Sequence, residues 1–106
     1  MGKDIHIIIE HRTYWGDKAH WDGVGHTDAP FRNSDFFNKL DKKGIFGLPD
    51  DASWETKTYL GEKDLFSPGW MMYGDFYKLK HAEDLYPMMF KEKYHKDLRV
   101  CWAYDW

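Results

Sequence analysis

The two ends of the chain alternate between apolar and polar residues with a period of two. Residues 3–11 place three isoleucines on one side and mainly polar residues on the other, and residues 98–106 carry large apolar side chains at every second position. Because successive side chains of a strand point to opposite faces, each segment is predicted to be a strand with one apolar face. We predict that these two strands pair in an antiparallel sheet. The more polar face of the first strand then holds Asp4, His6, Ile8 and Glu10.

Helix signals and turn residues divide the part of the chain between these strands. Asn33 or Ser34 can cap a helix that stops at Gly44, since short polar side chains cap helix starts and glycine often follows helix ends. The sequence predicts a second helix over 53–61 and a third over 87–94, which begins with a proline at a favoured first-turn position.

Shorter signals complete the prediction of the fold. Residues 14–21 and 70–73 are predicted to be short strands, residues 75–81 are predicted to be helical, and loops are expected through Gly23 and Gly25. The mixture of short elements with paired end strands predicts an α+β fold. In this fold about three short helices pack on one face of a small antiparallel sheet.

Length, charge and cysteine content exclude several classes of protein. A chain of 106 residues has the size of one domain, so residues 1–106 are treated as a single domain. The net charge of −3 lacks the broad positive field that non-specific nucleic-acid binding requires. The one cysteine, Cys101, favours a reducing cytoplasm, and no apolar run approaches the roughly 20 residues that span a membrane. We therefore expect neither a membrane nor non-specific nucleic acid as partner.

The polar face of the first predicted strand contains a candidate metal site. Asp4, His6 and Glu10 supply carboxylate and imidazole donors, which are common ligands of divalent metal ions. A complete site needs a further donor, for which Asp105 and His26 are candidates. The alternative is a polar sheet face that is simply solvated, as is usual for antiparallel sheets.

The same residues suggest acid–base chemistry, with His6 as the proton carrier and Asp4 or Glu10 holding its tautomer. No activated nucleophile accompanies them in the sequence. Cys101 has small neighbours and no adjacent base, so a packed thiol is expected. The absence of a complete catalytic set favours a binding protein over an enzyme.

The aromatic content indicates a binding function. Aromatic residues make up 19% of the chain and include six tryptophans, and such rings stack on flat ligands or anchor partner proteins. Arginine and a helix N-terminus can hold a phosphate or carboxylate, although the sequence alone favours Arg32 as a solvated loop charge and Asn33 as a helix cap. The candidate ligand-binding residues are His6, Trp15, Arg32, Asn33, Trp70 and Arg99.

Several motifs resemble a family of small uncharacterised bacteriophage and prophage proteins that opens with Met-Gly-x-Asp-Ile-His-x-x-x-Glu. The opening match covers residues 1–10, and the closing match runs from Arg99 to Asp105. Shorter matches lie at residues 32–33 with 36–37, at 47–53 and at 67–70. The resemblance spans nearly the whole chain and implies a phage origin and the host cytoplasm, without implying a reaction.

Three functional hypotheses follow. The leading one is a small phage accessory protein that acts by binding, either inhibiting a host defence component or sequestering a nucleotide-like signal, with a homo-oligomer as one possible assembly. The alternative is a metal-dependent phosphoesterase or related hydrolase, in which Asp4, His6 and Glu10 hold the ion and a metal-bound water attacks. The third is a structural or regulatory phage protein.

Overall fold

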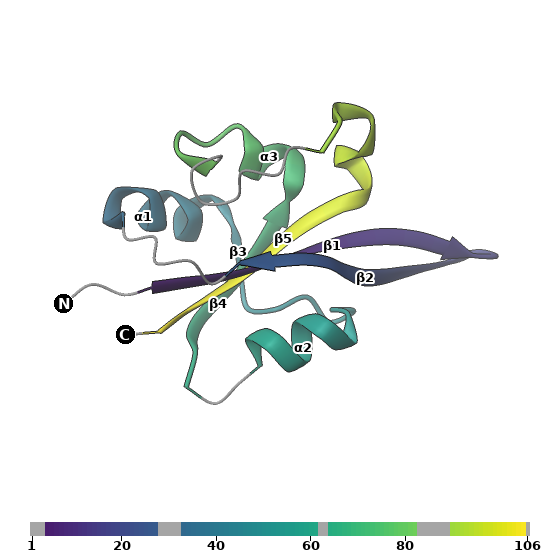
Figure 1. The fold of residues 1–106 in the computed structure, drawn as a ribbon, viewed down its shortest axis with the longest axis horizontal. Helices are drawn as coiled ribbons and strands as arrows, with labels where there is room; N and C mark the ends of the chain where they lie inside the picture. The colour runs from purple at the N-terminus through teal and green to yellow at the C-terminus, as the bar shows by residue number, and fades with distance from the viewer. Residues whose placement is uncertain (1–3, 28–32, 62–63, 83–89, 106) are drawn as a thin grey trace.

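A five-stranded antiparallel sheet forms the centre of the protein. The computed structural model describes residues 4–27, 33–61, 64–82 and 90–105. The strand order is β2-β1-β5-β4-β3, so the first and last strands of the chain are neighbours in the middle (Figure 1). The strands are β1 (Asp4–Trp15), β2 (Lys18–Thr27), β3 (Ile45–Phe46), β4 (Phe66–Met72) and β5 (Leu98–Asp105).

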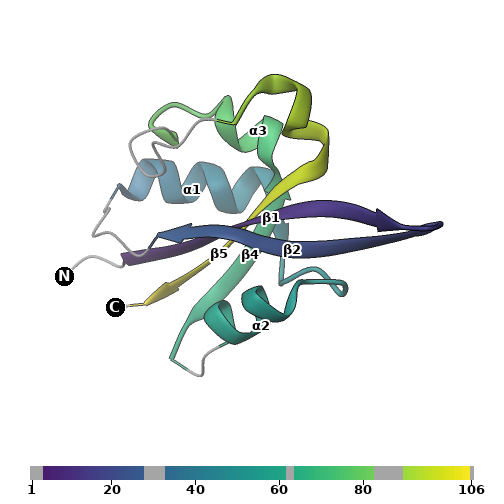
Figure 2. The ribbon, with the colours of Figure 1, turned by 45° about the vertical axis from the view of Figure 1, so that its right-hand side comes forward.

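Helices cover both faces of this sheet. Helices α1 and α3 lie on one side and α2 lies on the other, as Figure 1 and the turned view of Figure 2 both show. A short 3-10 helix, η1, leads into β5. The bounds are α1 (Ser34–Lys43), α2 (Trp54–Leu60), α3 (Tyr73–Tyr77) and η1 (Glu92–Asp97).

The predicted α+β fold with paired end strands is confirmed. Strands β1 and β5 pair antiparallel, with Asp4 opposite Asp105 and Glu10 opposite Arg99. The predicted start of the third helix, Pro87, lies outside the described residues. Of the rest of that segment, residues 92–94 belong to the 3-10 helix η1, which continues to Asp97.

The position of α2 differs from the expectation that the helices pack on one face. The reason is that β5 is buried at every position from Leu98 to Tyr104, and so is apolar or paired on both faces. Ile5, Ile7 and the large side chains of β5 pack against α1 and α3, whereas Ile8, Cys101 and Ala103 pack toward Leu60 of α2. A sheet that is apolar on both faces needs a cover on each.

Two predicted caps are confirmed and explain where α1 and α2 begin. The side chain of Asn33 accepts a hydrogen bond from the backbone amide of Phe36 at 3.0 Å. The hydroxyl of Ser53 accepts one from the backbone amide of Thr56, also at 3.0 Å. Such caps satisfy amides that have no partner inside the helix.

Strands β1 and β2 form a hairpin that extends beyond the rest of the sheet (Figure 1). Its turn uses Gly16 with a φ of +64°, a conformation that glycine adopts without strain. Gly23 and Gly25, which were expected in loops, lie in β2 and pair with β1. In the described part of the chain, no helix has the length and apolar character that a membrane crossing requires.

Candidate functional site

A buried polar network joins β1 and β5 to the start of α2. Glu10 has no exposed surface, and its side chain points to the α2 side of the sheet. Its carboxylate accepts hydrogen bonds from the backbone amide of Ser53 and from the hydroxyl of Thr56, both at 2.6 Å. It also accepts one from Nε of Arg99, and the thiol of Cys101 donates to it at 3.6 Å. Four donors therefore hold this one carboxylate.

Arg99 is fully engaged within the same network. Its Nη1 donates to the Asp51 carboxylate at 2.9 Å and its Nη2 donates to the Asp51 carbonyl at 3.2 Å. The guanidinium lies over the ring of Trp21, with 3.9 Å from Cζ to the ring centroid. Three of the five N–H donors of Arg99 are used in these hydrogen bonds, and the residue is 3% exposed, so its main role is to stabilise the fold.

Charges and hydrogen bonds set the titration of this network. Burial alone would raise the pKa of Glu10, but the hydrogen bonds from Thr56, Ser53 and Arg99 outweigh burial and hold that pKa below its usual value. Burial and the neighbouring Glu10 carboxylate raise the pKa of Cys101 far above its usual value. Cys101 is therefore a buried, protonated thiol, which fits the expectation of a packed side chain rather than a nucleophile.

We expect this carboxylate to make the protein sensitive to acid. A folded-state pKa below the unfolded value stabilises the fold at every pH above the unfolded pKa, about 4.3 for Glu. The stabilisation is lost as the pH falls through the folded-state pKa. Urea unfolding measured between pH 7 and pH 3 checks this. The variant Glu10→Gln should show a smaller decline over the acidic range, and an equal decline would contradict the prediction.

The three predicted metal ligands share a face of β1 but do not converge. His6 lies 2.9 Å from Asp105, measured from Nε2 to Oδ2, whereas Glu10 is held by Arg99. Ile8 lies between His6 and Glu10 on this face. A separation of four residues along a strand places the Cα atoms of His6 and Glu10 about 13 Å apart. Among the residues that the structure describes, no group of three His, Cys, Asp or Glu side chains could hold a metal ion. The metal-dependent hydrolase stays a prediction.

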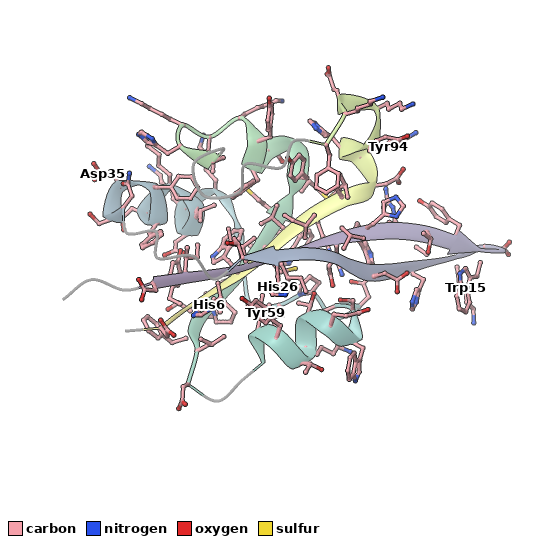
Figure 3. All side chains as sticks on the ribbon, viewed as in Figure 1. His6, Trp15, His26, Asp35, Tyr59 and Tyr94 are labelled. Atoms are coloured by element: carbon pink, nitrogen blue, oxygen red, sulfur yellow. The ribbon has the colours of Figure 1, made fainter. Side chains whose placement is uncertain are left out.

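The main candidate site is a hollow of about 510 Å³ between α2 and the strands β1 and β2. Three rings from three elements form its wall: His6 on β1, His26 on β2 and Tyr59 on α2. The ring centroids of His26 and Tyr59 are 4.6 Å apart, and those of His6 and Tyr59 are 6.1 Å apart. Figure 3 shows these three side chains together between the sheet and α2.

The register of the hairpin explains why the histidines meet. His26 lies opposite Ile8 across the β1–β2 pair, and His6 is two residues from Ile8 on the same face. Residues that are directly opposite in an antiparallel pair share a face, so both imidazoles point toward α2. Gly23 allows α2 to approach, because a Cβ atom there would lie 2.9 Å from Cβ of Glu55.

The remaining wall of the hollow is apolar and acidic. Ile8 and Leu65 supply apolar surface, and Trp54, 77% exposed, flanks the opening. Glu55 and Asp64 are the carboxylates at its wall, and none of the described lining residues is a lysine or arginine. Stacking rings beside carboxylates favour a flat ligand that is neutral or positively charged over a free phosphate.

The other predicted ligand-binding residues lie elsewhere. Trp70 and Arg99 line a separate hollow of about 510 Å³, which Asp51 also lines. Trp15 is at the tip of the hairpin, 73% exposed, with its ring 5.2 Å from that of His20 (Figure 3). Asn33 is the cap of α1 and Arg32 lies outside the described residues.

Comparisons with known proteins add no identification. No family model matches the chain, and no match was found among the curated proteins or the solved structures. The resemblance to bacteriophage proteins therefore stays a prediction.

Proposed function

We propose that the protein binds a small ligand with a flat heteroaromatic ring, such as the base of a nucleotide-like signal, in the hollow under α2. The observation that carries the proposal is the convergence of His6, His26 and Tyr59 on one hollow from three separate elements. Aromatic walls of this kind bind flat rings by stacking, with little dependence on the exact ring.

Polar groups around the hollow supply contacts for the edge of such a ring. When the His6 imidazole is neutral and Nε2 donates to Asp105, Nδ1 is its acceptor. The carboxylates of Glu55 and Asp64 accept hydrogen bonds from ring or exocyclic N–H groups. The same carboxylates repel phosphate, so the phosphates of a nucleotide would extend out of the opening.

The biological setting of the proposal comes from the resemblance to phage proteins. In that setting the protein is an accessory protein in the host cytoplasm that sequesters a nucleotide-like signal of the host defence. The size of the hollow supports a small molecule as the ligand, because clefts that hold small ligands have volumes of about 300–1,000 Å³.

Nucleoside binding tests the proposal directly. Calorimetric titration with adenosine, guanosine and cytidine should detect binding, with the nucleosides at least as tight as their monophosphates. The variants Trp54→Ala and His26→Ala should weaken binding about fivefold to a hundredfold, the effect of removing one stacking ring at about 1–3 kcal/mol. Both side chains are exposed, so the variants should keep the wild-type melting temperature.

Trp15→Ala is the matched control, because Trp15 is similarly exposed but lies at the tip of the hairpin. It should leave nucleoside affinity unchanged. An equal loss of affinity in Trp15→Ala would contradict the proposed site. Failure of every nucleoside to bind at about 1 mM would contradict the proposed ligand class.

A further inference from the structure

The opposite side of the sheet carries a second hollow with a different chemistry. It lies between the C-terminal half of α1 and the segment that follows α3, and its volume is about 520 Å³. Five of its six lining residues are lysines, the sixth being Leu79, and none of these described lining residues is acidic. The lysines are Lys39, Lys42, Lys43, Lys78 and Lys80.

These lysines form no ion pair in the part of the chain that the structure describes. The ion pairs found there use the side chains of Arg12, Arg99, His6 and His20 as cations. Lys39 and Lys43 are four residues apart on α1, a spacing at which like charges destabilise a helix. The protein thus concentrates unpaired positive charge in one hollow although its net charge is −3.

Helix electrostatics explain only part of this arrangement. Lys42 and Lys43 lie in the last turn of α1, where cations interact favourably with the helix dipole. Lys39 lies before that turn, and Lys78 and Lys80 follow α3. Two segments far apart in the sequence therefore direct lysines to the same hollow, which a single helix end does not require.

We propose that this hollow binds a compact small molecule carrying several phosphate groups. Each lysine ammonium is a point charge with three donors, and phosphate oxygens accept charge-assisted hydrogen bonds from such groups. A hollow of about 520 Å³ is large enough for a short chain or cluster of phosphates. A nucleic-acid backbone would instead be tracked by a basic stripe along the surface. The site is separate from the hollow under α2 and does not depend on the function proposed there.

Titration with inorganic tripolyphosphate is the test, at about 50 mM salt and again at about 200 mM salt. We expect binding that weakens at the higher salt. The triple variant Lys39→Gln, Lys42→Gln and Lys78→Gln should weaken it at least about tenfold. If the number of phosphates determines the affinity, ATP should bind about as tightly as tripolyphosphate and AMP should bind much more weakly.

The matched control removes the same number of positive charges at another place on the surface. Lys91→Gln, Lys93→Gln and Lys96→Gln remove three exposed lysines around η1. This control should keep the affinity for tripolyphosphate within about twofold. Equal losses in both triple variants, or no binding of tripolyphosphate at low salt, would overturn the proposal. Tighter binding of a single-stranded oligonucleotide that only the first variant loses would also overturn it, in favour of nucleic acid.

Discussion

Replacing Glu10 by alanine is expected to destabilise the protein by about 3–5 kcal/mol, the usual range when one member of a buried ion pair is removed. The substitution leaves the Arg99 guanidinium, 3% exposed, with Asp51 as its remaining carboxylate partner. The amide of Ser53 and the hydroxyl of Thr56 lose their acceptor as well. A buried donor without an acceptor destabilises the fold, because it has lost its hydrogen bonds to water without forming others. Denaturant unfolding at pH 7 measures the effect.

Asp97→Ala is the control for this prediction. Asp97 pairs with Arg12 at 3.2 Å, but both side chains are partly exposed, so the loss should be about 0–1 kcal/mol. The double variant Glu10→Met with Arg99→Met should lose less stability than Glu10→Ala, because the carboxylate that then loses its partner, that of Asp51, is exposed to solvent. A Glu10→Ala variant as stable as Asp97→Ala would show that the network contributes little.

The second large effect is expected at Trp102. Its ring is 1% exposed and lies against Gly44 and Gly69, in the layer between the sheet and α1. Trp102→Ala removes the largest fully buried side chain in the described residues and should cost about 3–5 kcal/mol. Thermal and denaturant unfolding check this. Trp15→Ala, at the exposed tip of the hairpin, should stay within about 0.5 kcal/mol of wild type.

Coupling between Trp102 and Gly69 provides a sharper version of this test. A Cβ atom on Gly69 would lie 2.8 Å from Cζ2 of Trp102, so Gly69→Ala should itself destabilise the protein. The same substitution should cost less in a Trp102→Leu background, where the ring is absent. Additive losses in the double variant would show that the ring is not the reason for glycine at this position.

The sequence predicted the two end strands and the caps because both depend on local patterns. Alternation over residues 3–11 and 98–106 defined two strands, and Asn33 and Ser53 marked the starts of α1 and α2. The pairing of Glu10 with Arg99 could not be predicted in the same way. It depends on the register of β1 against β5, and an alternating pattern fixes the face of a residue but not its partner across the sheet.

The sequence pattern did not predict the hollow under α2, because this hollow also depends on contacts between distant segments. Gly23 and Gly25 were interpreted as loop residues, although glycine within a strand can also mark the close approach of another element. In the structure that element is α2, which passes next to Gly23. The pairing of β1 with β2 also shifts register between Ile9 and Glu10 of β1, and this shift decides which residue of β1 lies opposite His26. The combination of His26 with Tyr59 was therefore missed.

The placement of β5 between β1 and β4 has a consequence for how the protein is made. The pair Glu10 and Arg99 is separated by 89 residues, and β5 completes both apolar layers. During synthesis on a ribosome, the isoleucines of β1 have no partner strand on that side until β5 has been translated, and Arg99 of β5 follows Glu10 of β1 by 89 residues. Long-range strand pairing of this kind is slow, so the nascent chain exposes apolar surface until β5 pairs. Chaperones would have to protect that surface from aggregation during this time.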